Sequence, residues 1–268
     1  MGIDAFRLDE KVAIVTGAGK GIGKTTAELL AEQGAHIVCI SRSKDDLDET
    51  AERVRALGRE ALVIPCDVMD ESQLRVAVEK TVAHFGAIDI LVNNAGAPGK
   101  GWGSIEKIGM ERFEHTVRLN LSSAYAMTHL CVPHMKAREG AAIVNVSSAL
   151  SWMVDKRFSA YAAAKAGMNQ MTRVTSYELA PAIRVNAVAP GAVETPSTAI
   201  ITENADMRAQ TEKWIPLRRM GKPMDLALGI LYLASPASAF VTGKILEIDG
   251  GMQAIPGSAI YENLASDV

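Results

Sequence analysis

Short apolar segments alternate with longer amphipathic segments along nearly the whole sequence. The apolar segments are continuous runs rich in valine, isoleucine and alanine, without the polar alternation of a strand that has one face in water. Such runs are typical of parallel strands that are buried on both faces. The predicted strands cover residues 12–16, 36–41, 61–65, 88–93, 142–147, 183–189 and 244–248.

The segments between these strands have the spacing of apolar residues expected for amphipathic helices. They cover residues 22–33, 45–57, 71–85, 110–138, 159–180 and 223–234. A strand, a helix and a second strand at this spacing indicate βαβ units, which build a doubly wound parallel sheet. The sequence therefore predicts the α/β class, with a sheet of about seven parallel strands and helices on both of its faces.

No repeat, low-complexity linker or compositional break divides the chain, so we expect one domain over residues 1–268. Two stretches interrupt the alternation. Residues 191–220 form a long connection with Pro196 and Pro216, and a connection of this length often covers a binding site as a lid. Residues 252–268 form a tail that we expect to be a disordered end, a subunit contact or part of a substrate pocket.

Charge, hydropathy and cysteine usage argue against several classes of protein. Lysine and arginine number 28 against 31 acidic residues, a net charge of −3, whereas nucleic-acid binders usually carry a marked basic excess. No apolar run reaches the length of a membrane span, and the N-terminus has no basic, apolar leader. Three cysteines without a CxxC pair indicate free thiols in a reducing compartment. We expect a cytoplasmic protein that contacts neither nucleic acid nor membrane.

A glycine-rich turn, TGAGKGIGKT, follows the first predicted strand and opens the first helix. Backbone N–H groups at such a place can bind phosphate oxygens. A P-loop would need glycine in place of Ala18, and the GxGxxG fingerprint would need glycine in place of Lys24. The spacing that fits is Gly17, Gly21 and Gly23, which allow the turn, the approach of a pyrophosphate and close packing of helix on strand.

Four further features indicate one chemical site. An Asn-Asn-Ala-Gly segment ends the fourth predicted strand, and Asn120 lies within a long predicted helix. Ser148 follows the fifth strand, thirteen residues before Tyr161. Tyr161 and Lys165 are four residues apart, so they lie on one helix face. A nearby ammonium or an oxidised nicotinamide ring lowers the pKa of a phenol, which can then act as an acid–base group near neutral pH.

With these motifs in this order, the sequence resembles the short-chain dehydrogenase/reductase family from Lys11 to Gly251. The matching segments are Thr16-Gly17-x3-Gly21-x-Gly23, Asp67-Val68, Asn93-Asn94-Ala95-Gly96, Asn120, Ser147-Ser148, Tyr161-x3-Lys165, Arg184-Val185-Asn186, Pro190-Gly191 and Asp249-Gly250-Gly251. The resemblance implies a Rossmann-like fold and an oxidoreductase with a nicotinamide cofactor. The approach to Arg184 is one or two residues shorter than is usual in the family, which affects only a turn.

The resemblance implies catalytic roles for Asn120, Ser148, Tyr161 and Lys165. Tyr161 would exchange a proton with the substrate oxygen, and Ser148 would hydrogen-bond to that oxygen and polarise it. Lys165 would lower the pKa of Tyr161 and bind the nicotinamide ribose. Asn120 would hold a water molecule that links Lys165 to solvent.

A cofactor site at the carboxyl ends of the strands also follows from the resemblance. The glycine turn would bind the pyrophosphate, Asp67 and Val68 would border the adenine, and Asn94 would border the ribose. The segment from Pro190 to Thr195 would contact the nicotinamide and the phosphates. The full expected set is Gly17, Gly19, Lys20, Gly21, Ile22, Gly23, Ser41, Arg42, Asp67, Val68, Asn94, Ala95, Gly96, Tyr161, Lys165, Pro190, Gly191, Val193 and Thr195.

The end of the second strand bears on the choice between the two nicotinamide cofactors. Enzymes that use NAD typically carry an acid here, which binds the ribose 2′-hydroxyl. Ser41 stands at this position, and Arg42 can bind a 2′-phosphate. Lys20 in the glycine turn can add a second positive charge. The sequence therefore predicts a preference for NADP(H), with NAD(H) as the alternative.

The predicted activity is the interconversion of a secondary alcohol and a ketone, without a metal ion, because the histidines form no HExxH or HxH pattern. Trp102, Trp152, Met153 and Trp214 line either an apolar pocket or the core. With the tail, Trp152 and Met153 favour a bulky apolar carbonyl substrate, such as a hydroxysteroid-like one. The alternatives are a 3-oxoacyl-thioester reductase, a non-catalytic NADP-binding regulatory protein and, last, a P-loop phosphotransferase. The resemblance implies a homodimer or homotetramer.

Overall fold

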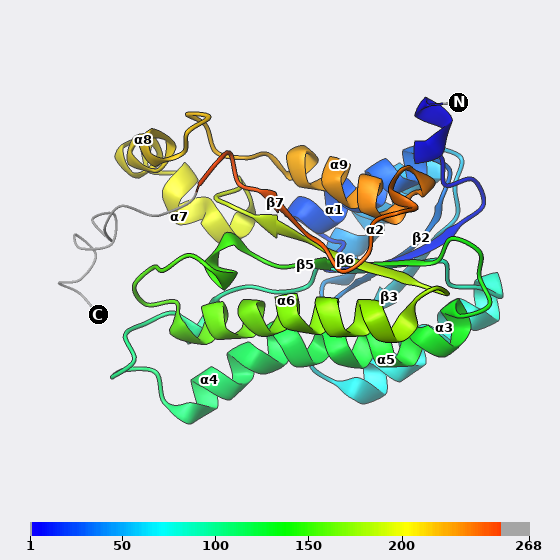
Figure 1. Cartoon of the computed structure of the whole chain (residues 1–268), viewed down its shortest axis with the longest axis horizontal. Helices are drawn as coiled ribbons and strands as arrows, with labels where there is room; N and C mark the ends of the chain where they lie inside the picture. Colours follow the sequence, from blue (N-terminus) through cyan, green and yellow to red (C-terminus); the bar gives the residue numbers. More distant parts are fainter. Residues whose placement is uncertain (1, 253–268) are drawn as a thin grey trace.

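Seven parallel strands form one sheet in the computed structural model, which describes residues 2–252 (Figure 1). The strands are β1 (Val12–Thr16), β2 (His36–Ser41), β3 (Ala61–Pro65), β4 (Ile90–Asn93), β5 (Ala142–Val146), β6 (Arg184–Pro190) and β7 (Ile245–Ile248). Their order across the sheet is β3-β2-β1-β4-β5-β6-β7. The chain thus winds outward from β1 to one edge, returns to β4 beside β1, and winds to the other edge.

This order confirms the predicted doubly wound, all-parallel α/β fold. In such a sheet a crevice opens where the winding direction reverses, outside the carboxyl ends of the two central strands. Here those strands are β1 and β4, which pair from Ala13 with Ile90 to Val15 with Val92. The carboxyl end of β1 carries the glycine turn and that of β4 carries the Asn-Asn-Ala-Gly segment. The fold therefore brings two of the sequence motifs to one place.

Helices cover both faces of the sheet. They are α1 (Gly21–Glu32), α2 (Lys44–Ala56), α3 (Glu71–Phe85), α4 (Met110–Val117), α5 (Ser123–Met135), α6 (Ser159–Leu179), α7 (Ala199–Thr202), α8 (Ala205–Trp214) and α9 (Pro223–Ala234). Figure 1 shows α1, α2 and α9 above the sheet and α3, α5 and α6 below it. Side-chain caps begin some of them: Ser43 accepts a hydrogen bond from the Asp46 backbone N–H at the start of α2.

Two parts of the chain differ from the sequence prediction. The helix predicted over residues 110–138 is divided into α4 and α5 by a π-helical turn at Arg118–Ser122. The connection over residues 191–220 contains the short helices α7 and α8, which lie together at one end of the sheet (Figure 1). That this connection closes over a site stays a prediction. Of the predicted tail, only Met252 is described, and residues 253–268 lie outside the described part.

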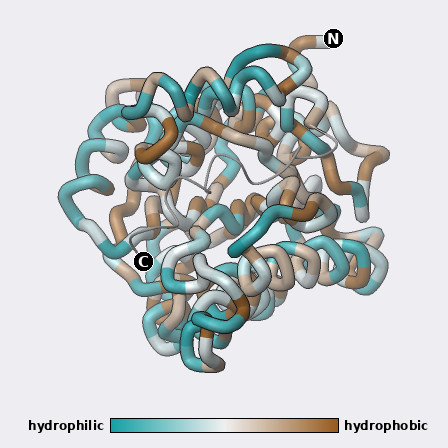
Figure 2. The backbone as a smooth tube through the Cα atoms, turned by 90° about the vertical axis from the view of Figure 1, so that its left-hand side faces the viewer, coloured by the Kyte–Doolittle hydropathy of each residue, from teal (hydrophilic) through white to brown (hydrophobic). Residues whose placement is uncertain are grey.

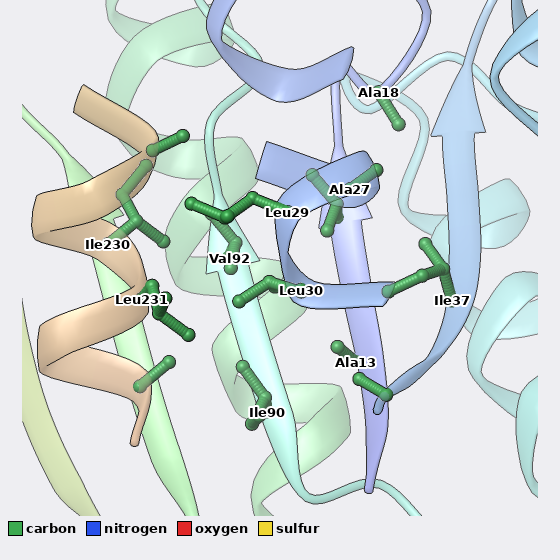
Figure 3. Close-up of a cluster of buried hydrophobic side chains, with 14 of the residues drawn as sticks. Ala13, Ala18, Ala27, Leu29, Leu30, Ile37, Ile90, Val92, Ile230 and Leu231 are labelled. Carbon is green, nitrogen blue, oxygen red and sulfur yellow. The ribbon is translucent and has the colours of Figure 1, made fainter. Parts of the chain in front are cut away.

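Alternate residues of each central strand enter two separate hydrophobic clusters. Ala13 and Val15 of β1 pack with α1 and α9, whereas Val12 and Ile14 pack on the other face with α3 and α5. Figure 3 shows Leu30 of α1 directed toward Val92 of β4 in the first cluster. Hydrophilic residues gather on the outer turns of the helices (Figure 2). Burial on both faces explains why the strands are apolar throughout.

Leu30 tests how far the core depends on α1. Its side chain is fully buried, so Leu30→Ala should lower the free energy of unfolding by about 2–5 kcal/mol through lost burial and the cavity left behind. Chemical denaturation measures the change. Leu57→Ala is the control, because Leu57 is 45% exposed at the end of α2, and it should cost less than about 1 kcal/mol. Equal losses in the two variants would contradict this packing.

Candidate active site

The glycine turn between β1 and α1 is shaped for close contact with a ligand backbone or phosphate. Gly17 has a φ of +69°, which favours glycine, and its N–H donates to the Ile40 carbonyl at 2.7 Å. A Cβ on Gly23 would lie 2.2 Å from the Gly17 carbonyl oxygen. Helix α1 begins at Gly21, and no side chain caps it within the described residues. Its first N–H groups therefore point out at the end of β1, where an anion would be stabilised.

The end of β4 holds this turn from the side. The Asn94 side-chain Nδ2 donates to the carbonyl of Thr16 at 2.8 Å and to that of Gly17 at 3.3 Å. The Thr16 hydroxyl accepts the backbone N–H groups of Asn94 and Ala95, each at 3.0 Å. The Asn94 side chain, predicted to border a ribose, thus braces the turn. Its neighbour Ala95 is fixed by the same contacts.

The segment after β6 reaches the glycine turn from the opposite side. A Cβ on Gly21 would lie 3.3 Å from the Thr195 methyl group, so these two predicted contact residues are neighbours. Gly191 lies against the backbone of Asp249 beyond β7, and Val193 forms a β-bridge with Gly221. The predicted residues Pro190, Gly191, Val193 and Thr195 therefore run from the end of β6 to the turn.

Ser41, at the end of β2, also lies beside the turn, since its hydroxyl would be 3.2 Å from a Cβ on Gly19. Lys20 projects to solvent and pairs with Asp46 at 3.1 Å. The Lys20 ammonium holds the pKa of the Asp46 carboxyl below its ordinary value. Arg42 follows Ser41 and is exposed. The two cations predicted to bind a 2′-phosphate therefore differ in their surroundings: the charge of Lys20 is partly neutralised by Asp46, and Arg42 is exposed to solvent.

Asp67 and Val68 follow β3, on the same side of the sheet as Ser41. The Asp67 carboxylate accepts the Met69 backbone N–H at 3.0 Å, and the Asp67 N–H donates to the Gln73 side chain at 2.9 Å. Val68 is buried against Leu74 and its neighbours in the second cluster. Asp67 and Val68, which are predicted to border the adenine, therefore lie after a strand that is two positions from β1 in the sheet.

Tyr161 and Lys165 lie four residues apart on one face of α6, and Lys165 reaches the last residue of β5. Lys165 is only 2% exposed, and its ammonium donates to the Val146 carbonyl at 2.7 Å. It lies 5.6 Å from the centre of the Tyr161 ring. Ser148 follows Val146 by two residues, is largely buried, and hydrogen-bonds to Tyr161. The structure therefore brings Ser148, Tyr161 and Lys165 together at the carboxyl end of β5.

The pKa values of this pair differ from the sequence prediction. Lys165 is predicted to lower the pKa of Tyr161. Instead, burial raises the pKa of Tyr161 to about 12, and the hydrogen bond with Ser148 offsets only part of this. Burial also lowers the pKa of Lys165 to about 7. Desolvation disfavours both charged forms, and the ammonium donates to Val146 rather than to the phenol oxygen. In the protein alone, Tyr161 is a neutral hydroxyl beside a lysine that titrates near neutral pH.

Asn120 reaches the same place from the π-helical turn between α4 and α5. Its Nδ2 donates to the carbonyls of Ala97 and Thr116, at 2.8 and 2.9 Å. Its Oδ1 is buried without a hydrogen-bond partner among the described residues. A Cβ on Gly96 would lie 2.6 Å from this oxygen and 3.3 Å from the Lys165 ammonium. An unpaired acceptor close to a buried ammonium fits a bound water or ligand hydroxyl.

The predicted pocket residues have different environments. Met153 is buried with Ile201, Ile215 and Met220, so it joins β5 to the connection over residues 191–220. Trp152 is 37% exposed. Trp102 stacks under the Arg157 guanidinium at 5.2 Å, which joins the loop after β4 to the loop before α6. Met153 is therefore a core residue. Trp152 lies partly at the surface, and Trp102 lies between the loop after β4 and the loop before α6.

Asn169 and Ser151 are polar residues of this region that the sequence did not single out. Asn169 lies one helical turn beyond Lys165 and hydrogen-bonds to Ser147 and Ser151, which flank Ser148. The spacing of Tyr161, Lys165 and Asn169 at intervals of four residues was a usable signal, because these positions share one helix face.

Within residues 2–252 no group of three or more metal-ligating side chains is found. No helix there is long and apolar enough to cross a membrane.

Comparisons with known proteins identify the family. A family model described as "Enoyl-(Acyl carrier protein) reductase" matches residues 17–253. The 3-oxoacyl-(acyl-carrier-protein) reductase FabG of Thermotoga maritima is 40% identical over 248 residues, which cover 92% of this chain and 99% of that protein. The chain belongs to the short-chain dehydrogenase/reductase family and is an oxidoreductase of that family.

Solved structures agree with this assignment. A 7α-hydroxysteroid dehydrogenase in complex with NADH and 7-oxo glycochenodeoxycholic acid matches with a TM-score of 0.89 and 33% identity, over 94% of this chain and 98% of that one. Pseudomonas aeruginosa RhlG in an NADP active-site complex matches with a TM-score of 0.87 and 30% identity, over 93% and 98%. The predicted family and its Rossmann-like fold are therefore confirmed.

The buried ammonium of Lys165 should leave a mark on stability. Its pKa is lowered to about 7 in the folded protein, so between pH 7 and the ordinary lysine value the unfolded chain binds more protons, and stability rises with pH. Lys165→Met removes this dependence. Relative to the variant, wild type should gain on the order of 2 kcal/mol between pH 6 and pH 9.

Urea denaturation at several pH values measures this difference. The unpaired Val146 carbonyl of the variant adds a loss that is the same at every pH, so only the slope matters. Lys80→Met is the control, because Lys80 lies exposed on α3, and its curve should run parallel to wild type. Parallel curves for Lys165→Met as well would show that the ammonium is not buried as described.

Proposed function

We propose that the protein interconverts a secondary alcohol and a ketone with NADP(H) as the hydride carrier, and that Tyr161 is the acid–base residue. The observation that carries the proposal is the contact between Ser148, Tyr161 and Lys165 at the carboxyl end of β5. A hydroxyl pair backed by a lysine near its titration midpoint can deliver or accept one proton at a substrate oxygen. The adjoining glycine turn supplies a place for a dinucleotide.

The residues of the turn fit such a cofactor on structural grounds. Gly17, Gly21 and Gly23 leave a surface without side chains at the uncapped start of α1, where a pyrophosphate would receive backbone N–H groups. Thr195 lies over the same turn. The unpaired Asn120 Oδ1 and the Lys165 ammonium border Gly96 and can receive a ribose hydroxyl or a water. The nicotinamide would supply the hydride to the carbonyl carbon and, when oxidised, a positive charge near Tyr161.

In the reducing direction, the Tyr161 hydroxyl gives its proton to the substrate oxygen as that oxygen gains negative charge. Ser148 hydrogen-bonds to the same oxygen and stabilises the charge. Lys165 can then restore the proton to Tyr161, because its pKa of about 7 allows it to gain and lose a proton near neutral pH. In the oxidising direction the same groups act in reverse, and Tyr161 accepts the proton of the alcohol.

The favoured substrate is a bulky apolar carbonyl. Support comes from the partly exposed Trp152 in the segment after Ser148 and from the structural likeness to the steroid dehydrogenase. The Thermotoga reductase supports the alternative, a 3-oxoacyl thioester. A non-catalytic regulatory protein would keep the cofactor site without turnover. A phosphotransferase is disfavoured because Ala18 stands where a P-loop has glycine.

Supporting properties extend the proposal to the assembly and the compartment. Tyr125 of α5 and Val174 and Tyr177 of α6 are exposed apolar side chains on the outer helical layer, which supports a homodimer or homotetramer. The cysteines Cys39, Cys66 and Cys131 are buried free thiols, which supports a cytoplasmic location. We retain residues 1–268 as one domain, because the sheet and both helical layers are continuous along residues 2–252.

Oxidation of NADPH in the presence of ketones, oxosteroids and 3-oxoacyl thioesters tests the activity. Tyr161→Phe should lower kcat by at least about 10³-fold, because the proton donor is lost, while NADPH binding measured by fluorescence stays within threefold. Tyr177→Phe is the matched control on the same helix, 90% exposed, and should be as active as wild type. Turnover by Tyr161→Phe at the wild-type rate would refute the mechanism. Tight NADPH binding without turnover on any carbonyl would favour the regulatory alternative.

Arg42 should decide the preference for NADP(H). Lys20 has Asp46 beside it, whereas Arg42, which follows Ser41, forms no ion pair within residues 2–252. Arg42→Asp should weaken NADPH binding by at least tenfold more than NADH binding, through loss of a charge-assisted contact and gain of repulsion. Titration with both cofactors measures the ratio. Arg53→Asp, which exchanges a similar charge on the exposed face of α2, should leave the ratio unchanged. An unaltered ratio in Arg42→Asp would overturn the assignment.

A further inference from the structure

Helix α6 presents one line of polar side chains to the sheet. Tyr161, Lys165 and Asn169 follow one another at intervals of four residues, so they lie along the same face. Lys165 and Asn169 are both buried, at 2% and 6% exposure. The first two residues belong to the proposed reaction. Asn169 has no role in it so far, yet it is buried at the same end of β5.

Asn169 uses both ends of its amide on residues that flank Ser148. Its Oδ1 accepts the Ser147 hydroxyl at 2.5 Å, and its Nδ2 donates to the Ser151 hydroxyl at 2.7 Å. The Ser151 hydroxyl in turn donates to the Ser148 carbonyl at 2.6 Å. The amide thus spans the turn that contains Ser148, holding its preceding neighbour directly and its carbonyl through Ser151.

The Ser148 side chain depends on this turn for its direction. Its backbone is extended, with φ −166° and ψ 151°, and its hydroxyl accepts the Leu150 N–H at 3.2 Å within the short 3-10 turn Ala149–Ser151. The Ser151 N–H also donates to the Ser148 carbonyl at 3.0 Å. Without the Ser151 hydroxyl, the Ser148 carbonyl would keep only the contact from the Ser151 N–H among the described residues. The contact from Asn169 then fixes where the turn sits relative to α6.

We propose that Asn169, acting through Ser151, is a positioning residue that holds the Ser148 hydroxyl at its distance from Tyr161. The inference rests on the proposed function and extends it, since one helix then sets both hydroxyls that act on the substrate oxygen: Tyr161 as part of α6 and Ser148 through Asn169. An amide is needed because the site requires one acceptor and one donor on the same side chain. A displacement of about 1 Å at such a site can lower a rate on the order of 10²-fold.

Thr172 offers a matched control on the same face of α6. Its hydroxyl accepts the Asn145 side chain at 2.9 Å and donates to the Met168 carbonyl at 2.8 Å, and the residue is fully buried. Thr172→Val therefore removes one buried hydrogen bond between α6 and β5 and one within α6, but touches no residue of the turn at Ser148. It reports what a loss of helix packing alone does to the reaction.

The kinetic experiment compares Asn169→Leu, Ser151→Ala and Thr172→Val, with the best carbonyl substrate found for the wild type. Asn169→Leu and Ser151→Ala should lower kcat by 10- to 100-fold, with KM and the dissociation constant of NADPH within threefold. Thr172→Val should keep kcat within threefold of wild type, even if its melting temperature falls as far as those of Asn169→Leu and Ser151→Ala. Equal losses of kcat in all three variants would assign Asn169 a purely structural role and overturn the proposal.

A double variant tests whether the effect passes through Ser148. In a Ser148→Ala background, Ser151→Ala should cause less than a threefold further loss of kcat, because there is no longer a hydroxyl to position. A further loss as large as that in the wild-type background would overturn the proposal. Non-additivity of this kind is what separates a residue that acts through Ser148 from one that acts independently.

A readout without turnover keeps the inference separate from the proposed function. Amide hydrogen exchange of residues 148–153 should be at least tenfold faster in Asn169→Leu and Ser151→Ala than in wild type, and unchanged in Thr172→Val. Faster exchange with no turnover in the wild type on any carbonyl would refute the proposed function and leave Asn169 as the clamp of this turn. Unchanged exchange in Asn169→Leu, or faster exchange with unaltered kcat, would overturn the inference itself.

Discussion

The hydrogen bond from the Lys165 ammonium to the Val146 carbonyl ties α6 to the end of β5, where the proposed catalytic groups meet. A charged group buried at 2% exposure pays a desolvation cost, seen in the lowering of its pKa to about 7. The contact with Val146 offsets part of that cost and aligns α6 with the last residue of β5. Ser148 comes two residues after Val146 and Tyr161 one turn before Lys165, so this contact joins the two segments that carry the hydroxyls.

The same helix is aligned with the sheet by neutral polar contacts further along. Asn145 of β5 donates to Thr172 of α6 and accepts from Asn93 of β4, both at 2.9 Å, in a region that is otherwise apolar. An unpaired buried amide group costs free energy, so a shift of α6 along β5 that broke these hydrogen bonds would be unfavourable. Apolar packing alone would tolerate such a shift with less loss. The polar line along α6 therefore fixes how α6 lies on β5 through several contacts, of which those of Lys165 and Asn169 lie nearest the proposed catalytic groups.

The sheet could be predicted from the sequence because the physics that buries both of its faces leaves continuous apolar runs, and β1, β2 and β3 begin and end where the runs do. The glycine turn and the Tyr161–Lys165 pair were visible for a similar reason, since each is local in sequence. The π-helical turn at Arg118–Ser122 was not, because it depends on Asn120 bonding to Ala97 in a different segment. The directions of the Tyr161 and Lys165 pKa shifts also required burial to be known.

The proposed cofactor-binding half of the site, around the glycine turn, and the half around Ser148, Tyr161 and Lys165 differ in how well the sequence alone predicts them. The dinucleotide half is built largely from backbone, and glycine spacing is enough to indicate it. The proposed selectivity for NADP(H) would depend on side-chain charges from three segments: Lys20 in the turn, Arg42 after β2 and Asp46 in the first turn of α2. Since Asp46 is held ionised by Lys20, a 2′-phosphate placed near Lys20 would also meet a carboxylate. The attraction of these three side chains for a 2′-phosphate would therefore come mainly from Arg42. Counting Lys20 and Arg42 as two free cations, as the sequence alone suggests, overstates that attraction.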